Sequence, residues 1–291
     1  MKMAMVVLAA MFMALLMGGC AGTPVTVVSY NVDNFFGAKD KIPQRGDRPK
    51  SAEAVTALAA AIHQVNADVL VLQEVQTGGL LKEFNEKQLA DMGYSRVVVD
   101  EAGDTRGLTL AVLSRYPVVQ VVSHKEVPLD ATLKGADAAK ESNHFARDLF
   151  RVDVKLPSGK ALTIYDLHLK STGDFKDDPK SAKWRLREAT RAAAIVREET
   201  DKEGIKNFVV AGDFNEPANS AAVQAVIQGA GGLRDALADA KERDTFVSGK
   251  VKSAVDDILL SPGLSGKAEV VDGPTFAKAS SHRPVKVVLK L

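Results

Sequence analysis

The sequence predicts one α/β domain in which two β-sheets pack together and helices cover them. Continuous apolar runs of strand length, such as 68–72 and 207–211, are typical of strands buried on both faces. Longer segments place apolar residues on one helical face, and others alternate apolar with polar residues as half-buried strands do. Neither an internal repeat nor a Pro/Ser-rich linker interrupts the 291 residues, so we expect a single domain.

The individual elements follow from the same patterns in chain order. Residues 25–30 are rich in β-branched side chains and predict the first strand. Ser51 is a suitable N-cap for a helix over 51–66, in which Leu58 and Ile62 share a face. Further helices are expected at 79–91, 180–202 and 219–229. Further strands are expected at 68–72, 94–99, 108–114, 117–123, 147–155, 161–170, 207–211, 255–260, 268–271 and 285–290. The loops that would shape the rim of a cleft are expected at 32–50, 130–143 and 171–179.

The composition excludes several classes of protein. Hydrophobic residues make up 46% and charged residues 26%, the balance of a soluble globular protein and not of a disordered or multi-span membrane chain. One cysteine excludes an internal disulfide framework and a Cys-cluster zinc site, and five histidines argue against a His-rich metal centre. Because Lys and Arg number 38 against 37 acids, no strongly basic surface for nucleic acid is implied.

Residues 1–20 are expected to be a targeting segment and not part of the fold. Lys2 precedes an apolar run over 3–17, which is shorter than the roughly 20 residues of a spanning helix. The following Gly-Gly-Cys resembles a bacterial lipoprotein signal, in which Cys20 is lipidated and becomes the first residue; plain secretion and an uncleaved anchor are the alternatives. We therefore expect residues 21–291 to form a mature domain of zero net charge. This domain would be lipid-anchored in the cell envelope, in the outer membrane or facing the periplasm.

Polar or ionisable side chains stand at the ends of five expected strands. Asn31 follows the first strand, and Glu74 follows the buried run 68–72 soon afterwards. His168 and Asp213 come at the ends of two later strands, and His282 precedes the last one. Because α/β scaffolds present ligand-binding groups at strand ends, we expect these side chains to gather in one cleft.

Several of these side chains suit a hard divalent cation. Glu74, Asn31, Asp213 and Asn215 carry oxygen ligands or hydrogen-bonding groups of the kind that Mg²⁺, Mn²⁺ or Ca²⁺ prefer. Alternation along the strand places the side chains of Asp213 and Asn215 on one side, about 6.5 Å apart. The sequence therefore predicts a metal site at these strand ends.

The histidines add proton chemistry to this predicted metal site. His168 and His282 can donate to a phosphate oxygen or take a proton from water near neutral pH. Asp256 can orient His282 and stabilise its cationic form, as carboxylates do in other catalytic pairs. A hard cation beside two histidines and a carboxylate suits phosphoester hydrolysis, in which phosphate charge must be neutralised and the leaving oxygen stabilised.

Six segments occur in the order and spacing of a known family's motifs and cover nearly the whole mature chain. They are SYNVDNFF (29–36), LVLQEV (70–75), DLHLKS (166–171), VAGDFNEP (210–217), VDDILLSPGL (255–264) and SSHRPV (280–285). The chain thus resembles the endonuclease/exonuclease/phosphatase (deoxyribonuclease I-like) superfamily. The resemblance implies a four-layer α/β/β/α sandwich, with two mainly antiparallel sheets flanked by helices and a divalent metal at the cleft.

The resemblance also implies a role for each matching residue. Glu74 would be the main metal ligand, and Asn31 would lie beside the metal and the scissile phosphate. His168 would bind and polarise the phosphate. Asp213 and Asn215 would position the attacking water and the phosphate.

The general base is implied less directly. Asp256 would pair with His282, the expected general base, but the sequence leaves open whether His282 or Asp213 takes the proton. Arg147 lies where relatives place a substrate-contacting arginine; a surface ion pair is the alternative. Ser281 stands where the family usually has an aspartate, so the site loses a negative charge and we predict weaker Mg²⁺ affinity.

These residues lead to one expected function and two alternatives. The expected function is a metal-dependent phosphoesterase, and within that class a phosphodiesterase that acts on DNA or RNA. A phosphodiesterase for lipid head groups, or an inositol-phosphate-type phosphatase, is the alternative and suits a membrane-tethered enzyme. A catalytically silent binding lipoprotein is the third possibility, because Ser281 replaces an acid. We expect a monomer that contacts the membrane through its lipid anchor.

Overall fold

The computed structural model describes residues 24–37, 48–175 and 177–291. Its core is built from two six-stranded sheets. The first sheet contains, in spatial order, β13 (Ala268–Val270), β14 (Val285–Leu289), β1 (Val25–Phe35), β2 (Val69–Gln76), β4 (Leu108–Ser114) and β3 (Arg96–Val99). The second contains β5 (Val118–Ser123), β6 (Leu149–Lys155), β7 (Ala161–His168), β8 (Phe208–Asp213), β12 (Asp256–Leu260) and β9 (Arg234–Asp235).

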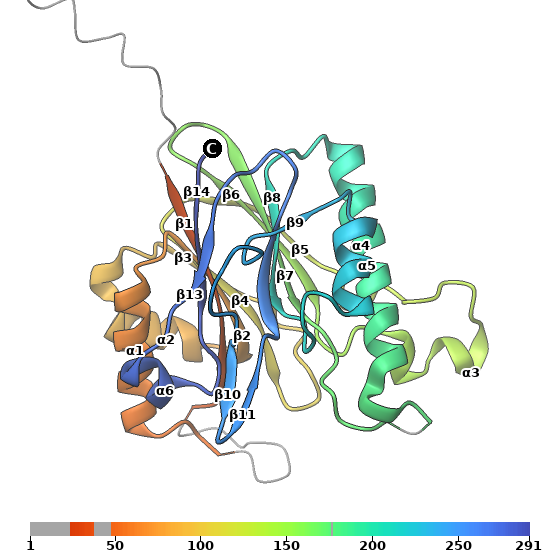
Figure 1. The fold of residues 1–291 in the computed structure, drawn as a ribbon, viewed down its shortest axis with the longest axis horizontal. Coiled ribbons are helices and arrows are strands. Elements are labelled where there is room, and N and C mark those ends of the chain that lie inside the picture. The colour runs from red at the N-terminus through yellow and green to blue at the C-terminus, as the bar shows by residue number, and fades with distance from the viewer. Residues whose placement is uncertain (1–23, 38–47, 176) are drawn as a thin grey trace, which may run out of the picture.

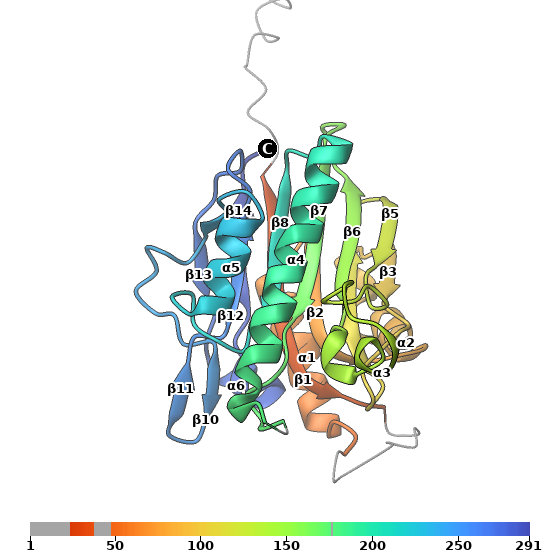
Figure 2. The same cartoon turned by 90° about the vertical axis from the view of Figure 1, so that its right-hand side faces the viewer.

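Helices cover the outer face of each sheet, so the molecule has four layers (Figure 1). The helices on the first sheet are α1 (Ala52–Val65), α2 (Leu80–Gln88) and α6 (Pro274–Ala279). Those on the second sheet are α4 (Ala182–Glu203) and α5 (Ala221–Gly229), which lie side by side along it (Figure 2). The short α3 (Gly135–Ala138) lies apart from both layers. Short 3-10 helices cover Ala90–Met92, Glu141–Asn143 and Pro179–Ser181.

Three apolar cores separate these four layers. Leu58 and Ile62 of α1 pack against the outer face of the first sheet. Val71 and Ile164 belong to a second core between the two sheets, and Ala192 of α4 belongs to a third on the outer face of the second sheet. Buried strands therefore carry apolar side chains on both faces, which confirms the predicted four-layer α/β/β/α sandwich.

Each sheet contains one parallel pair of strands at its centre. β1 runs parallel to β2, and β7 runs parallel to β8. The remaining neighbours in both sheets are antiparallel, so the sheets are mainly antiparallel as expected. Because the carboxyl ends of parallel strands meet at one edge, the residues that end β1, β2, β7 and β8 come together there.

Glycine permits the close pairing of β7 with β8. Gly212 has a φ of +146°, and a Cβ added there would lie 1.8 Å from the carbonyl oxygen of Leu167. Only a residue without a side chain fits this position. The pairing aligns His168 with Asp213 at the ends of the two strands.

Several short elements depart from the sequence-based expectations. β1 continues through residues 32–35, which were expected to begin a loop, and α3 interrupts the loop expected at 130–143. The patterns also did not predict β9, α6 or the hairpin of β10 (Phe246–Ser248) and β11 (Val251–Ser253). These segments are too short, and too polar in the hairpin, to show a periodicity. Among the described residues, no helix is both long and apolar enough to cross a membrane.

Candidate active site

An irregular turn at the end of β1 presents the first group of polar side chains. The pairing of β1 with β2 shifts register between Asn31 and Phe35, and Asp33 and Asn34 have positive φ values. Short polar residues tolerate this left-handed backbone better than others do. The side-chain oxygen of Asn31 (Oδ1) accepts a hydrogen bond from the backbone amide of Asp33 at 2.9 Å. The turn therefore directs both Asn31 and Asp33 away from the sheet ladder.

Glu74 lies at a matching irregularity in β2. The pairing with β4 shifts register between Gln73 and Val75, and Glu74 has a φ of +62°. A non-glycine residue with this backbone conformation stores strain that is common at functional sites. Its Oε2 accepts a hydrogen bond from the Asn34 amide at 2.9 Å. Its Oε1 lies 4.0 Å from Nε2 of His168, which brings the ends of the two sheets together.

Asp213 lies at the centre of the site. Its Oδ2 accepts a hydrogen bond from the amide nitrogen of the Asn31 side chain at 2.9 Å. The same oxygen lies 3.6 Å from Nε2 of His168 and 3.9 Å from Nε2 of His282. Its Oδ1 accepts from the backbone amide of Asn215 at 2.8 Å. One buried carboxylate therefore contacts residues from three other motifs.

His282 and Asp256 form a buried pair beside Asp213. Nδ1 of His282 lies 2.8 Å from Oδ2 of Asp256, and a carboxylate can only accept, so Nδ1–H donates. This leaves Nε2 directed toward Asp213. The ring of Phe246 lies edge-on to His282, with centroids 5.1 Å apart, so the β10–β11 hairpin supports the histidine. One atom each of Asp213, Asp256 and His282 lies within 4.8 Å of the other two, as in a metal-binding cluster.

The charges of this cluster strongly perturb one another. Burial raises the pKa of Asp213, and repulsion from Asp256 adds to this, so the pKa reaches about 7. Burial lowers the pKa of His282, but the Asp256 carboxylate and its hydrogen bond outweigh that effect and raise the pKa to about 10. Burial lowers the pKa of His168 well below its ordinary value, and the nearby charge of Arg147 adds to this shift.

The donor set fits a hard divalent cation. Asp33, Glu74, Asp213 and Asp256 supply carboxylate oxygens, and Asn31 supplies an amide oxygen. Oδ1 of Asp256 is buried without a hydrogen-bond partner among the described residues. Two buried carboxylates that repel each other, one with an orphaned oxygen, are the environment that a bound cation stabilises.

The structure brings together six of the residues predicted from sequence: Asn31, Glu74, His168, Asp213, Asp256 and His282. Asn215 lies at the edge of this group. β8 ends at Asp213 and Asn215 has a φ of +53°, so the extended-strand spacing assumed for this pair does not apply. The amide nitrogen of the Asn215 side chain instead donates to the carbonyl of Leu169 at 3.0 Å.

Arg147 lies close to the site but outside the contacts described above. Its Nε is 3.7 Å from Oδ2 of Asp104, and only 9% of the residue is exposed. Arg147 thus forms an ion pair, as the alternative expectation had it, but with a side chain that is largely buried. Cys20 and the rest of the predicted signal, 1–20, lie outside the described residues.

Sequence reasoning missed Asp33 as a member of the site. Oδ2 of Asp33 accepts hydrogen bonds from both the hydroxyl and the amide of Ser281, at 2.8 and 3.2 Å. A carboxylate therefore lies beside Ser281, where the resemblance described above implies an aspartate. The i, i+2 spacing from Asn31 was the available signal, but a strand pattern does not show the irregularity within β1 that brings Asp33 to this place.

Comparisons with known proteins agree with this architecture. The sequence model of the Endonuclease/Exonuclease/phosphatase family matches residues 28–275. The fold is similar to a family protein from Bacteroides thetaiotaomicron, with a TM-score of 0.63, 21% identity, and coverage of 92% of this chain and 97% of that one. It is also similar to truncated TDP2 of Caenorhabditis elegans, with a TM-score of 0.63, 17% identity, and coverage of 92% and 98%.

The human nocturnin catalytic domain, solved with a bound sulfate anion, has a TM-score of 0.64 and 19% identity, with coverage of 92% of this chain and 94% of that one. At these identities the likeness to solved structures concerns the fold alone. A comparison with curated protein sequences found no match.

Proposed function

Because this chain belongs to the endonuclease/exonuclease/phosphatase family, we propose that it is a divalent-metal-dependent phosphodiesterase that hydrolyses DNA or RNA. Family members typically hydrolyse phosphoester bonds, and the acidic and histidine cluster supports that class of reaction here. The observation that carries the proposal is the position of the Asp213 carboxylate, within 3.6 Å of His168 and 3.9 Å of His282.

In this proposal Glu74, Asn31 and Asp33 would hold the cation next to the scissile phosphate. When bound, the cation supplies positive charge that neutralises the phosphate and stabilises the leaving oxygen. His168 is buried beside Asp213, and this burial holds the pKa of His168 well below its ordinary value. The ring is therefore neutral and would donate a hydrogen bond to a phosphate oxygen. The side-chain oxygen of Asn215, which has no hydrogen-bond partner in the described part of the chain, would bind the attacking water.

The proton of the attacking water passes to the Asp213–His282 pair. With a pKa of about 7, Asp213 is poised to accept a proton near neutral pH. His282, held by Asp256 and with a pKa of about 10, carries positive charge beside it and stabilises the developing negative charge. Of the two candidates for general base, we therefore propose Asp213, because the ring of His282 already carries its proton.

A substrate panel tests this function. The purified protein is incubated with Mg²⁺ or Mn²⁺ and plasmid DNA, RNA, sphingomyelin, an inositol phosphate or bis(p-nitrophenyl) phosphate, with EDTA as the control. We expect cleavage of nucleic acid that EDTA abolishes, and loss of cleavage in Glu74→Ala and His282→Ala. Turnover of the lipid or inositol substrate alone would favour the head-group enzyme. Metal binding without turnover of any substrate would favour the silent binder.

We further propose that Cys20 is lipidated and anchors the domain to the cell envelope. The support is the sequence itself: a basic start, an apolar run over 3–17 and two glycines before the cysteine. Expression in a bacterial host followed by mass spectrometry of the amino-terminal peptide tests this. We expect a diacylated or triacylated Cys20 in the membrane fraction and loss of acylation in Cys20→Ser. An unmodified cysteine in that fraction would contradict the proposal.

A further inference from the structure

β1 begins at the end of the molecule that lies farthest from the candidate active site. The site forms where β1, β2, β7 and β8 end, and along an extended strand the start of β1 at Val25 lies about 20 Å from Asn31. In Figure 1 the start of β1 and the carboxyl-terminal residue lie at one end of the sandwich, and the β10–β11 hairpin lies at the other. That hairpin contacts the site through Phe246 and His282. The chain therefore enters the domain on the side opposite the proposed catalytic residues.

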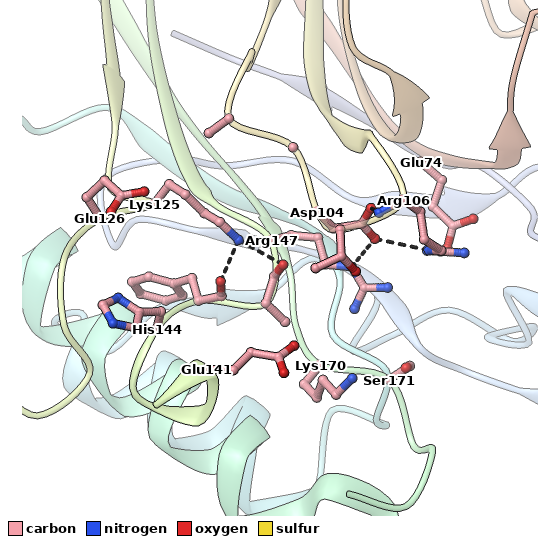
Figure 3. Close-up of a pocket in the computed structure, with 15 residues that line it drawn as sticks. Glu74, Asp104, Arg106, Lys125, Glu126, Glu141, His144, Arg147, Lys170 and Ser171 are labelled. Atoms are coloured by element: carbon pink, nitrogen blue, oxygen red, sulfur yellow. Dashed lines mark hydrogen bonds and ion pairs between the residues drawn. The ribbon is translucent and has the colours of Figure 1, made fainter. Parts of the chain in front are cut away.

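The space for a substrate also lies at the site end of the molecule. A cavity of about 750 Å³ opens beside Glu74, and its walls come from 102–106, from 141–147 and from the segment after β7 that contains Lys170 (Figure 3). The strand pairings put these walls at the site end, because β4 and β6 begin there and β7 ends there. A substrate that enters this cavity approaches from the side opposite the start of β1.

Four segments form the end of the molecule at which β1 starts, and together we call them the amino-terminal pole. They are the turn 156–160 between β6 and β7, residues 204–207 between α4 and β8, the loop 261–267 between β12 and β13, and residues 290–291 after β14. Val25 pairs with Leu289, so the last of these segments follows directly beside the start of β1. The pole is therefore the part of the domain next to the preceding chain.

The fold holds these four segments next to one another. The Ser261 hydroxyl donates a hydrogen bond to the Lys206 carbonyl at 3.0 Å. The Lys290 amide donates to the Ser265 carbonyl at 3.1 Å. The turn 156–160 adjoins this row because β7, which follows the turn, pairs with β8. The side chains that these segments carry consequently share one surface.

The amino-terminal pole carries lysines and no acidic side chain. Each of its four segments contains one lysine: Lys160, Lys206, Lys267 and Lys290. Two more lie beside it, at the end of β6 and in the last turn of α4: Lys155 and Lys202. All six are exposed. The lysine ion pairs of the described structure belong to residues outside the pole: Lys87, Lys140 and Lys278.

Acidic side chains on the neighbouring elements are already paired. Three of them form ion pairs with arginines at 3.1, 2.6 and 2.6 Å: Asp68 with Arg115, Asp201 with Arg197, and Glu203 with Arg151. Glu269 of β13 lies opposite Lys286 of β14. The positive charge of the pole is therefore not cancelled within the described part of the chain, and the acidic cluster lies at the other end of the molecule.

The chain between Cys20 and the domain is short. The structure describes the chain from Pro24 onward, and four residues of extended chain span at most about 14 Å. An acylated Cys20 would thus keep the pole close to the lipid head groups, where the electrostatic screening length is about 8 Å at physiological ionic strength. Because the tether makes docking intramolecular, a modest attraction per lysine is enough to orient the domain.

From this arrangement we propose that the amino-terminal pole docks on a bilayer that contains anionic lipids, so that the active site faces away from the membrane. The inference goes beyond the proposed hydrolase activity and takes only the tether from the proposed acylation of Cys20. In this orientation the site lies about 20 Å or more beyond the pole, out of reach of head groups in the same membrane. The substrate would then come from the aqueous phase, which disfavours the lipid head-group enzyme.

Lysine acetylation, followed by mass spectrometry, tests this orientation. The full chain is expressed in a bacterial host and reconstituted in nanodiscs of phosphatidylcholine, alone or with about one-third phosphatidylglycerol. We expect Lys155 and Lys202 to react at least about threefold more slowly on the anionic lipid, and about 0.5 M NaCl to remove this difference. Lys82, an exposed lysine of α2, is the internal reference and should react equally on both lipids.

Two variants separate the pole from the overall charge of the protein. The pole variant, Lys160→Gln with Lys206→Gln, Lys267→Gln and Lys290→Gln, should lose the protection of Lys155 and Lys202. The control variant makes the same change at four exposed lysines elsewhere and should keep it: Lys134, Lys183, Lys250 and Lys252. Because all eight side chains are exposed, both variants should melt at about the wild-type temperature.

The possible outcomes distinguish this inference from the earlier proposals. Equal acetylation of Lys155 and Lys202 on both lipids, with Cys20 acylated, overturns the docking surface but neither the anchor nor the hydrolase. Protection of Lys250 in place of Lys155 overturns it too, because the site end would then face the bilayer. If duplex DNA on phosphatidylcholine nanodiscs protects the pole as well as the anionic lipid does, the pole is a nucleic-acid surface and membrane docking is wrong. Salt-sensitive protection in protein with an unmodified Cys20 supports the pole and overturns the acylation.

Discussion

The hydroxyl of Ser281 donates a hydrogen bond of 2.8 Å to the carboxylate of Asp33, from a segment 248 residues further along the chain. The Ser281 amide donates to the same oxygen. Burial raises the pKa of Asp33, but these two hydrogen bonds and the charge of Lys50 outweigh it, so the pKa lies below its ordinary value. A carboxylate therefore stays ionised next to Ser281, where the family resemblance implies an aspartate.

Ser281→Asp is expected to tighten Mg²⁺ binding and to destabilise the metal-free protein. The new carboxylate adds a hard ligand, but it also replaces the donor to Asp33 with a like charge. We expect the dissociation constant for Mg²⁺ to fall by about tenfold, measured by calorimetric titration, while the metal-free melting temperature drops. Unchanged or weaker Mg²⁺ binding would refute the idea that Ser281 weakens the site.

Glu74→Gln is expected to remove the stabilisation that a divalent cation gives. The carboxylate has one oxygen engaged by Asn34 and the other open toward the site, so the amide would lose the charge without losing the shape. We expect the rise in melting temperature on adding Mn²⁺ to disappear, with affinity at least about tenfold weaker. Glu86→Gln on the exposed face of α2 makes the same chemical change and should keep the wild-type response.

Asp256→Asn is expected to lower the pKa of His282, which is about 10 in the native pair. Without the Asp256 charge, burial lowers the pKa of His282 with less compensation. We expect this pKa to fall by at least about two units in an NMR titration of the metal-free protein. In the wild type this raised pKa contributes stability that is fully present below pH 6.5 and is lost as pH rises through about 10. Asp256→Asn should not show this loss of stability as the pH rises.

The exposed pair of His63 and Asp91 supplies the matched control for Asp256→Asn. The hydrogen bond from Asp91 raises the pKa of His63, and Asp91→Asn removes this carboxylate partner. The substitution should leave the titration of His282 unchanged. If the pKa of His282 stays near 10 in Asp256→Asn, the ion pair does not hold the charge of the ring.

Asp148→Asn is expected to flatten the pH dependence of stability. Burial raises the pKa of Asp148 to about 7, so the folded protein retains a proton that the unfolded chain releases from about pH 4. The contribution is fully present below pH 3.8 and is lost as pH rises through 7. Urea unfolding at pH 5 and pH 8 should show a drop in free energy that is smaller in the variant by about 2 kcal/mol. Asp239→Asn, which is exposed, should match the wild type, and equal drops in all three proteins would exclude this role.

Gly212→Ala is expected to disrupt the pairing of His168 with Asp213. The new Cβ would meet the Leu167 carbonyl oxygen at 1.8 Å, so β7 and β8 must separate. We expect a loss of about 3–5 kcal/mol in urea unfolding. Gly263→Ala, whose added Cβ would lie 3.9 Å from its nearest neighbour, should cost less than about 1 kcal/mol. If Gly212→Ala lowers the unfolding free energy only slightly, the prediction is wrong and β7 and β8 can adapt to the added methyl group.

Sequence patterns predicted the main elements because periodicity and side-chain type are local. The run at 207–211 is apolar enough to indicate a buried strand, and β8 covers Phe208–Asp213. The same reasoning failed for Asn215, because a strand pattern does not show where the backbone turns left-handed. It also passed over the β10–β11 hairpin, whose three-residue strands carry no periodic signal but whose Phe246 supports His282.

The sequence by itself determined the layered α/β class, the identities of the residues at the strand ends and hence the kind of chemistry they can perform. Only the tertiary structure decided which of these residues perturb one another's pKa, because burial and Coulomb interactions depend on distances between segments far apart in the chain. The hydrogen bond between Asp33 and Ser281 depends on such a distance. No local pattern predicts it, because it joins two segments that lie far apart in the chain.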